Sequence, residues 1–580
     1  MRRVTFLALV LAGIAVPSAQ AQSPLRLVPQ EADLFLEVPN PAGLIQTVLD
    51  DPLLERLRKL DAFAELQDFT NVRRFYQLVA YYEKELGAKW PEVLDQIAGK
   101  GVAFAVKIGP EPAPFLVVLQ GKNPQTTKKF FDLSLNLLEQ ELNRQEAKNL
   151  PVRGRLGGAD MVTIGNDLRA VVKGSNIFLS NREEALKLSL ELLQAGAKAK
   201  GIDKLRSVAD ARRLLPKKPL VWFWLNFEFF KNLPQADQVL SLPRNDIFQT
   251  VFFGSFLDLV KRSDFMCASI SREKSGYLTT IRLPAGRKGM PKALGVHVPM
   301  GDEVGSLPTL QPKGTIYSNS SYFDIAKFWT FRKQLFTEQQ VEQFEKFDKN
   351  SARALLGNRF SDLIQKIGAH HRFVVVNQPK TGYKKQPKQK LPAFAYVVDL
   401  RDPKFGKTLN ALIRAGALLA TTQIKMNLVE EKEGEYEIVG YRFSEDRDLP
   451  QDRNGLRFNF SPCFATIENQ FMICSTLELG HELARLLAKE AKTQPRQRSL
   501  AVDNDIVYGN GLAELVALFK DQLMVQTALS QAVPPEQAEK QVDALIDWIR
   551  GLGRIVSTTT FGDDRFSIDI RLIYPRKPKP

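Results

Sequence analysis

Short apolar runs of strand length recur along the chain, and each is followed by an asparagine and then by apolar residues at helical spacing. The runs are at residues 34–38, 220–225, 315–318 and 506–509, and the asparagines are Asn40, Asn226, Asn319 and Asn510. Apolar positions that recur every three or four residues are typical of an amphipathic helix. An asparagine side chain accepts hydrogen bonds from the N–H groups of a first helical turn. The pattern therefore predicts four copies of a strand, a capping asparagine and a helix.

The two halves of the chain repeat this organisation at a longer period. Strand patterns at residues 102–108 and 115–119 in the first half have counterparts at 373–376 and 394–400 in the second. Each half continues with a hairpin and a helix, and the helices are predicted to begin with capping boxes, Asn181 to Glu184 and Ser475 to Glu478. An amphipathic helix and a second hairpin then close each half. A period this long excludes a solenoid and predicts two similar domains in tandem.

The predicted fold class is α+β, with two tandem similar domains that each contain a mainly antiparallel sheet and packed helices. A chain of 580 residues is longer than a single core usually fills. We predict the boundary where apolar periodicity fades and prolines recur, at Pro284, Pro291, Pro299, Pro308 and Pro312. Domain 1 is expected at residues 25–290, a linker at 291–306 and domain 2 at 307–575.

The first residues have the pattern of a signal peptide. Two arginines precede an apolar run at residues 6–16, and Ala19 and Ala21 supply the small side chains that signal peptidase requires. We expect cleavage near Ala21, which removes residues 1–21 and exports the mature chain to the periplasm or beyond. No later stretch reaches the ~18 apolar residues of a spanning helix. No transmembrane segment is therefore expected in the mature chain.

The chain carries a formal net charge of +15, and cations gather in a loop at residues 378–391. This loop contains no acidic residue, and its lysines are Lys380, Lys384, Lys385, Lys388 and Lys390. The matching connection of the first half, at 109–114, is short, so the fold does not require the longer loop. Two interpretations stay open: a solvated, flexible loop, or contact with an anionic envelope surface such as lipid head groups or wall polymer. A basic tail at 576–580 is a second cationic segment, and no nucleic-acid partner is expected.

Three cysteines are too few for a disulfide scaffold. Cys463 and Cys474 fall on the two arms of one predicted hairpin, and a turn at Glu468 and Asn469 makes them direct partners. A turn one residue later offsets them, so the register decides whether a disulfide is expected in an oxidising compartment. Cys267 is expected to be a buried thiol within a strand.

Two short matches to penicillin-binding enzymes lack the structural context that their chemistry requires. Ser271 and Lys274 have the S-x-x-K spacing, but they fall at the polar tip of a predicted hairpin instead of on a helix. The K-T-G sequence that begins at Lys380 lies in the lysine-rich loop instead of on a strand. Neither match therefore predicts a nucleophile.

Two resemblances to nucleotide-binding loops are also incomplete. Gly509 and Gly511 follow a strand, but Glu514 stands where the third glycine of a dinucleotide fingerprint belongs. Its carboxylate would repel a pyrophosphate. Arg401 stands where the first glycine of a P-loop would precede Gly406. No phosphate cradle is predicted.

The supply of histidine limits metal and triad chemistry, since the chain has only His297, His370, His371 and His481. Adjacent histidines point to opposite faces of a strand, and His481 lacks a second ligand one helical turn away. Asp446, Asp448 and Asp452 are interleaved with arginines, which disfavours a calcium site. We predict no catalytic residue, no metal site and no cofactor.

Residues 220–230 form a dense aromatic segment that includes Trp222, Phe223, Trp224 and Phe230. Aromatic side chains on both faces of a strand indicate a central strand that is covered on each side. A buried core is the favoured interpretation, and the wall of a ligand pocket is the alternative.

The opening of the chain resembles that of a family of exported bacterial domains of unknown function. The residues that carry the resemblance are Pro29, Glu31, Ala32, Asp33 and the strand from Leu34 to Asn40, with a later apolar strand around residues 102–107. The resemblance implies a secreted α+β domain without an established activity, and it supplies no catalytic residues. The second half departs from the pattern, because Lys313 and Gly314 follow its proline.

The sequence favours a noncatalytic binding or structural role in the cell envelope. The first alternative is a carrier of an apolar or lipid ligand, which requires an enclosed apolar cavity of several hundred Å³, as is typical of ligand sites. The second alternative is a hydrolase with an unrecognised site, which requires a nucleophile and a base within hydrogen-bond reach in a cleft.

Overall fold

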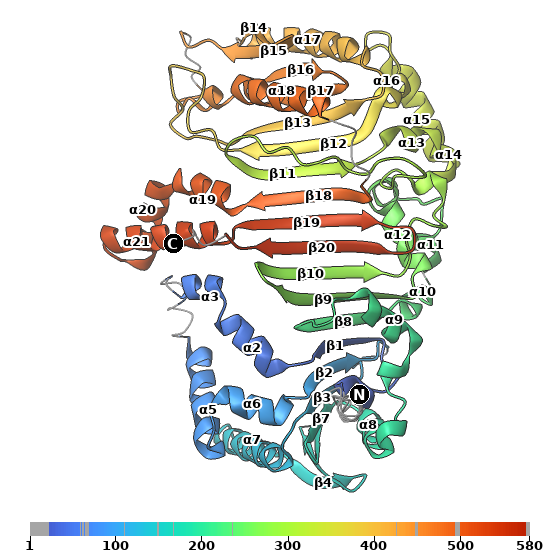
Figure 1. The fold of residues 1–580 in the computed structure, drawn as a ribbon, viewed down its shortest axis with the longest axis vertical. Coiled ribbons are helices and arrows are strands. Elements are labelled where there is room, and N and C mark those ends of the chain that lie inside the picture. The colour runs from blue at the N-terminus through green and yellow to red at the C-terminus, as the bar shows by residue number, and fades with distance from the viewer. Residues whose placement is uncertain are drawn as a thin grey trace, which may run out of the picture. The chain divides into compact units, whose positions relative to one another are not determined.

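The computed structural model describes residues 23–575, except 59, 61, 62, 64–68, 110, 148, 149, 166, 235, 425, 447–450 and 494–498. The predicted signal peptide and basic tail lie outside the described residues, as does Asp448. The chain divides into two compact units (Figure 1). Unit 1 comprises Met1–Asp51 and Gln67–Asn226, and unit 2 comprises Pro52–Leu66 and Phe227–Pro580.

The strands of unit 1 form an antiparallel sheet in which β1 pairs with β8 and β2, and β3 pairs with β2 and β7. From one edge to the other, the strands are β8 (Val221–Asn226), β1 (Leu34–Val38), β2 (Gly101–Val106), β3 (Phe115–Gln120), β7 (Asn176–Ser180), β6 (Leu168–Lys173), β5 (Ala159–Ile164) and β4 (Val152–Leu156). The aromatic strand β8 buries Trp222 and Trp224 against Phe35, as the core interpretation predicts.

Helices of unit 1 lie in the connections between these strands. They are η1 (Pro24–Leu27), α2 (Pro41–Leu49), α5 (Thr70–Leu86), α6 (Trp90–Ala98), α7 (Pro124–Arg144), α8 (Glu183–Ala195), η2 (Gly196–Lys198), η3 (Ile202–Lys204) and α9 (Arg206–Leu214). Helix α7 begins after Asn123, whose side chain caps two N–H groups of the first turn. Its buried Phe131 and Leu135, one turn apart, pack against β5, β6 and β7 and fix the helix on the sheet.

The strands of unit 2 form a longer antiparallel sheet, which runs from β9 to β14 (Figure 1). In spatial order they are β9 (Phe265–Glu273), β10 (Gly276–Leu283), β20 (Phe566–Ile573), β19 (Arg554–Phe561), β18 (Ala501–Tyr508), β11 (Thr315–Tyr322), β12 (Ile367–Val376), β13 (Ala393–Leu400), β17 (Gln470–Cys474), β16 (Cys463–Ile467), β15 (Tyr436–Phe443) and β14 (Met426–Glu433). The predicted α+β class with mainly antiparallel sheets is confirmed.

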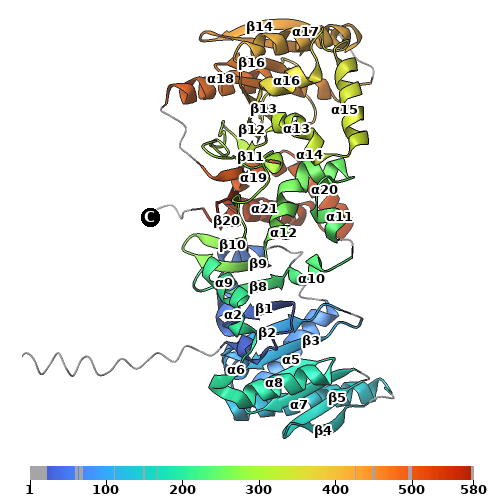
Figure 2. The same cartoon turned by 90° about the vertical axis from the view of Figure 1, so that its right-hand side faces the viewer.

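Helices of unit 2 gather mainly at the two ends of these strands. They are α3 (Pro52–Leu57), α10 (Glu228–Lys231), α11 (Ala236–Leu240), the π-helical turn η4 (Gln249–Phe253), α12 (Gly254–Arg262), η5 (Lys292–Leu294), α13 (Ile325–Thr330), α14 (Arg332–Leu335), α15 (Glu338–Ser351), α16 (Phe360–Lys366), α17 (Phe405–Ile424), η6 (Leu456–Asn459), α18 (Leu477–Lys492), α19 (Gly509–Ala517), α20 (Lys520–Gln531) and α21 (Pro535–Gly551). Helices α12 to α16 lie at one end of the strands, and α19 to α21 lie at the other (Figure 1). Figure 2 shows α13, α14 and α15 beside one another.

The strands of the two halves pair in the same order. Strand β1 lies between β8 and β2 in unit 1, as β11 lies between β18 and β12 in unit 2. The residue that follows β7 and the residue that follows β17 also accept a hydrogen bond in the same way: Asn181 Oδ1 accepts from Phe115 N of β3 at 3.0 Å, and Ser475 Oγ accepts from Phe394 N of β13 at 2.9 Å. A tandem duplication predicts this shared order.

Only one of the four predicted capping asparagines caps a helix. The side chain of Asn40 accepts a hydrogen bond from Gly43 N at 2.9 Å. By contrast, Asn226 ends β8, Asn319 lies within β11 and Asn510 lies inside α19. The prediction fails at Asn319 because the strand continues beyond it and its amide bonds to aspartates of β18.

The predicted capping boxes are also wrong. Helix α8 begins at Glu183, and the side chain of Asn181 bonds to the backbone of the neighbouring strand instead. Helix α18 is capped by Thr476, whose hydroxyl accepts from Leu479 N at 3.4 Å. In both places the side chain expected to cap the helix accepts a hydrogen bond from the backbone of a strand instead.

The segment predicted as a linker, 291–306, is packed inside unit 2. Its Leu294, Val296 and Val298 are buried, and Ser306 N donates to Ala501 O at the start of β18. The compact units therefore divide the chain at Asn226, well before the predicted boundary. The physical reason is that β10 pairs along its whole length with β20, which places the closing hairpin of the first half in unit 2.

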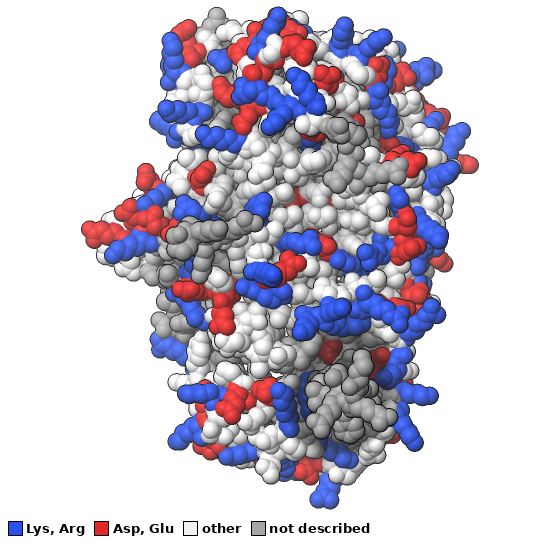
Figure 3. Space-filling view, viewed as in Figure 1, with Lys and Arg blue, Asp and Glu red and all other residues white. Residues whose placement is uncertain are grey.

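One face of the unit 2 sheet is covered by α18 and by the segment around Leu310, which share a core with β12, β13, β16 and β17. The opposite face exposes Phe394, Tyr396 and Ile473. Charged side chains are sparse over β11, β12 and β18 in Figure 3. Among the described residues, no helix combines the length and the apolar character needed to cross a membrane.

Candidate functional site

An aromatic cavity of about 360 Å³ lies within unit 2, between the η4 turn and helices α13 to α16. We call it the aromatic cavity, and its wall consists of Ile247, Val251, Phe323, Ile325, Phe328, Trp329, Arg332, Phe336, Phe344, Phe347, Phe360 and Ile364. Arg332 is the single ionisable residue in this wall. A pocket of this size and composition is typical of sites for small apolar molecules.

The wall is assembled from short helices that follow β11. Its rings pack edge to face or tilted, with centroid distances of 5.1 Å between Phe336 and Phe344 and 5.4 Å between Phe347 and Phe360. Thr337 and Gln340 form a capping box that starts α15 and so orients its two wall residues. The side chain of Gln340 also donates to Asn245 O at 2.7 Å, which ties α15 to the segment before η4.

The wall of the cavity is buried in one part and exposed in another. Phe336 and Ile364 are buried, whereas Phe347 is 56% exposed and Ile247 is 38% exposed. The exposed wall residues mark the mouth, which lies between η4 and α15.

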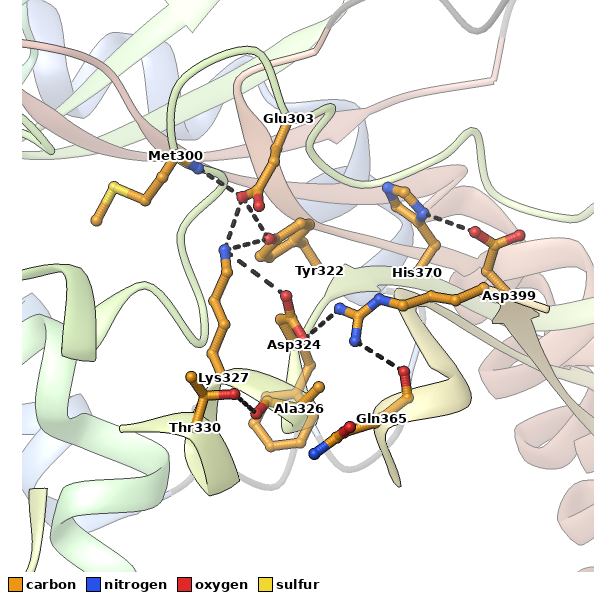
Figure 4. Close-up of polar contacts among 12 residues, drawn as sticks. Met300, Glu303, Tyr322, Asp324, Ala326, Lys327, Thr330, Gln365, His370 and Asp399 are labelled. Carbon is orange, nitrogen blue, oxygen red and sulfur yellow. Dashed lines mark hydrogen bonds and ion pairs between the residues drawn. The ribbon is translucent and has the colours of Figure 1, made fainter. Parts of the chain in front are cut away.

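A polar network lies behind the cavity, at the ends of β11 and β12 (Figure 4). Buried Asp324 forms ion pairs with Arg401 at 2.6 Å and with Lys327 at 3.7 Å. The Glu303 carboxylate accepts hydrogen bonds from Met300 N, Tyr322 Oη and Lys327 Nζ, each at 2.7 Å. The charges compensate one another, and the network holds α13 against the sheet.

Histidines support the cavity from the same side. Phe323, whose ring lines the cavity, lies 4.9 Å from the ring of His297 and 5.9 Å from that of His371. His371 Nε2 lies 2.8 Å from Phe323 O, and His370 Nδ1 lies 3.4 Å from Asp399 Oδ2. The two adjacent histidines thus serve different neighbours, as their opposite strand faces predict.

Burial and neighbouring groups shift the pKa values of several residues in this region. Burial raises the pKa of Tyr322 far above its usual range, and the neighbouring Glu303 carboxylate raises it further. Burial lowers the pKa values of His297 and His371, which keeps both rings neutral. Although burial raises the pKa of Glu303, hydrogen bonds from Lys327, Met300 and Tyr322 outweigh this effect and lower it. None of these groups is therefore poised as a nucleophile.

Other candidates for chemistry are also paired. His481 bonds to Glu431 at 2.6 Å and to Glu433 at 2.9 Å, and these carboxylates raise its pKa against the opposing effect of burial. In the part of the chain that the structure describes, no group of three or more His, Cys, Asp and Glu side chains is arranged to hold a metal ion.

The lysine-rich loop is folded against unit 2, and its cations face outward. Tyr383 is buried, and its hydroxyl donates to Phe460 O at 2.8 Å and accepts from Phe443 N at 3.0 Å. Lys380, Lys384, Lys385 and Lys388 are exposed, whereas Lys390 is half-buried. The loop is anchored by its uncharged residues, which leaves its lysines on the surface but away from the aromatic cavity.

Cys463 and Cys474 are direct partners across β16 and β17, with the turn at Glu468 and Asn469. Both are buried, and their thiols are free in this structure. The register is the one that permits a disulfide, because directly opposed residues have Cα atoms about 4.5–5.5 Å apart.

A second cavity, of about 330 Å³, lies within unit 1 between β2, β3 and α8. Its floor includes Ala105 and Leu116, and its wall also contains Glu31, Lys107, Arg182 and Glu184. The charged wall makes it a poorer match for an apolar ligand than the aromatic cavity.

Sequence reasoning did not locate the aromatic cavity. The available signal was the density of rings between Phe323 and Phe360, but rings at helical spacing are more often core. Residues 220–230, for which a pocket wall was the alternative to the favoured core, form strand β8 and the short helix α10 and do not line this cavity. The cavity also needs Ile247 and Val251, which lie far from the other wall residues in the sequence.

Comparisons with known proteins give little further information. No protein family model matches the chain, and no curated protein matches it. Among solved structures, the chain is similar to TP0453 in crystal form I, with a TM-score of 0.22 and 13% identity over 45% of this chain and 78% of that one. Crystal form III of TP0453 gives a TM-score of 0.23 and 12% identity over 45% and 79%. Likeness at these TM-scores carries no inference for this chain.

Proposed function

We propose that this protein binds an apolar ligand in the aromatic cavity and that it catalyses no reaction on it. The observation that carries the proposal is a cavity of about 360 Å³ with a wall of rings and aliphatic side chains. Burial of apolar ligand surface there contributes about 25 cal/mol per Å². The signal-peptide pattern at residues 1–21 supports binding in the cell envelope.

The single ionisable residue of the wall, Arg332, indicates the charge of the ligand portion that enters the cavity. The guanidinium of Arg332 bonds to Glu345 at 3.0 Å, donates to Trp329 O at 2.9 Å and lies 4.6 Å from the Trp329 ring centroid. Its charge is thus already compensated, while its buried Nε–H has no hydrogen-bond partner among the described residues. The portion of the ligand inside the cavity is therefore uncharged, such as an acyl chain or a fused ring system.

Titration with N-phenyl-1-naphthylamine, which fluoresces in apolar surroundings, tests the proposal. We expect saturable binding to the wild-type chain and at least tenfold weaker binding to Val251→Trp, because the indole fills space at the cavity wall. A tenfold change corresponds to about 1.4 kcal/mol. Mass spectrometry of material that copurifies with the chain would identify the natural ligand.

Two matched variants control for the size of the new side chain. Val525→Trp places the same side chain on exposed α20, and Ala185→Trp fills the unit 1 cavity. Both are expected to bind the probe as the wild-type chain does. Absence of saturable binding to the wild-type chain, or equal affinity in Val251→Trp, would contradict the proposal.

A further inference from the structure

Three phenylalanines on and beside the η4 turn form an exposed ridge next to the aromatic cavity. Phe248, Phe252 and Phe253 are 61%, 54% and 49% exposed. The ring centroid of Phe248 lies 4.7 Å from that of Phe252 and 5.9 Å from that of Phe253. We call these residues the phenylalanine ridge. Contiguous exposed apolar groups of this kind mark interaction surfaces.

The same helical turn supplies both the ridge and the cavity wall. Ile247 and Val251, four residues apart, line the cavity, while Phe248 and Phe252 have the same spacing and are exposed. Residues four apart lie on one helical face, so the turn presents two adjacent apolar faces. Its π-helical backbone, Gln249–Phe253, is a geometry found frequently at functional sites.

The ridge adjoins the mouth of the cavity. Ile247, an exposed wall residue at the mouth, immediately precedes Phe248 in the chain. The exposed apolar side chains of the ridge therefore begin directly beside an exposed wall residue of the cavity.

The ridge carries little charge. Between Ile247 and Val260 the single ionisable residue is Asp258, which is paired with Arg262 at 2.7 Å. Attraction by this segment is therefore hydrophobic, and it neither requires nor selects an anionic partner. Phenylalanine and leucine side chains on one face of a helix are the groups that enter the interfacial region of a bilayer.

We propose that the phenylalanine ridge contacts a lipid bilayer, and that apolar ligand passes between the bilayer and the aromatic cavity at this contact. The inference rests on the proposed function, because exposure of an apolar ligand to water during transfer is unfavourable. We favour a lipid surface because the ridge lies beside the mouth of a cavity for an apolar ligand. A surface that only binds another protein would not require a cavity at its edge.

Binding to phosphatidylcholine vesicles tests the contact directly, by energy transfer from tryptophan to a dansyl-labelled lipid. We expect the full chain to bind, and the variant Phe248→Ser/Phe252→Ser/Phe253→Ser to bind at least tenfold more weakly. Binding by the wild-type chain is expected to persist in 0.5 M salt, at which charge attraction is screened beyond about 4 Å. The control Phe75→Ser/Tyr76→Ser removes two exposed rings of α5 in unit 1 and should leave binding unchanged.

Stopped-flow transfer of N-phenyl-1-naphthylamine from the protein to the same vesicles tests the route. We expect a rate that rises with vesicle concentration for the wild-type chain, and a slower rate independent of concentration for the triple variant. The equilibrium affinity of the triple variant for the probe should stay within twofold of the wild-type value, which also shows that it folds.

The outcomes separate the two proposals. If the wild-type chain does not bind the probe, the proposed function fails. If the wild-type chain binds the probe but its transfer rate does not depend on vesicle concentration, the bilayer contact is overturned. Equal vesicle binding by the triple variant and the wild-type chain would also overturn it. Sedimentation equilibrium that shows a dimer dissociated by the triple substitution would likewise overturn it, since a second copy would then cover the ridge.

Discussion

Gly480 in α18 lies directly over the Cys463 thiol. A Cβ atom at this position would lie 2.5 Å from Cys463 Sγ. We expect Gly480→Ala to lower the free energy of unfolding by about 1–3 kcal/mol, because the core there cannot accept another carbon without displacement. Urea denaturation followed by circular dichroism measures the effect.

Two further variants make the Gly480 result specific. Gly416 lies in α17 with open space around its Cα, so Gly416→Ala should stabilise the protein by about 0.5–1 kcal/mol through helix propensity alone. Adding Cys463→Ala to Gly480→Ala removes the clashing sulfur and should recover part of the loss. If the double variant is as unstable as Gly480→Ala alone, a clash with the Cys463 thiol is not the cause of the destabilisation.

Asp503 gives the protein a pH-dependent stability near neutrality. Burial and the adjacent Asp505 carboxylate raise the pKa of Asp503 to about 7. In unfolded chains an aspartate loses its proton near pH 3.9. Between about pH 4 and pH 7 the folded state therefore holds a proton that the unfolded state lacks, and the free energy of unfolding falls as pH rises.

Comparison of variants isolates this contribution. We expect the decline in urea midpoint from pH 5 to pH 8 to be smaller in Asp503→Asn than in the wild-type chain. Asp521→Asn, a substitution at an exposed position of α20, should retain the wild-type decline. Identical declines in all three proteins would show that Asp503 does not keep its proton in the folded state.

The local pattern of the sequence predicts some side-chain roles and misses others for a physical reason. Asn40 caps a helix as predicted, because its exposed side chain accepts from Gly43 N in the turn that follows it. Asn319 does not, because Asp503 and Asp505 of β18 accept from its amide at 2.8 and 2.9 Å. Those partners lie in a distant part of the chain, and no local pattern contains them.

At the scale of elements, the lysine-rich loop stays the candidate for contact with an anionic surface. Replacing Lys380, Lys384, Lys385, Lys388 and Lys390 with Gln should weaken binding to vesicles that contain phosphatidylglycerol at least tenfold in low salt. Each lysine near such a surface contributes about 1 kcal/mol. Vesicle sedimentation measures the change, and the difference from the wild-type chain should shrink as salt is added.

A matched charge change controls for the net charge of the protein. Gln can replace the same number of exposed lysines in unit 1, namely Lys84, Lys198, Lys200, Lys217 and Lys218. If this control weakens vesicle binding as much as the loop variant does, the loop has no special role. Folding of the loop variant is expected to be unaffected, because the buried contacts of the loop come from uncharged residues that include Gln378 and Tyr383.

Hairpins were the most predictable elements, and the aromatic cavity was the least. A two-residue turn at Glu468 and Asn469 fixes every later pair of its hairpin, so the opposition of Cys463 and Cys474 follows from the turn alone. The cavity instead requires Val251 and Phe347 to line one space, although the first comes before β11 in the sequence and the second comes after it. Apolar periodicity indicates that each helix has a buried side but not what that side faces.

At the scale of the whole chain, the sequence predicts an α+β class correctly but places the boundary after the closing hairpin of the first half. The structure assigns that hairpin to unit 2, because β10 and β20 are direct neighbours. Proline-rich composition at 284–312 indicated a linker, yet Val298 and Leu307 of this segment are buried. A high proline content indicates an irregular backbone, but a segment with an irregular backbone can still be buried in the core of a domain.

The pairing of β10 with β20 also sets an order of events during synthesis. Leu283 pairs with Phe566, so β10 is made when just over half of the chain is still to come. Until the last strand emerges, a nascent chain carries β10 as an open edge, and such edges recruit strands from other molecules. A second copy carries the same β20, which makes exchange of the carboxy-terminal hairpin between crowded nascent chains the characteristic misassembly of this fold.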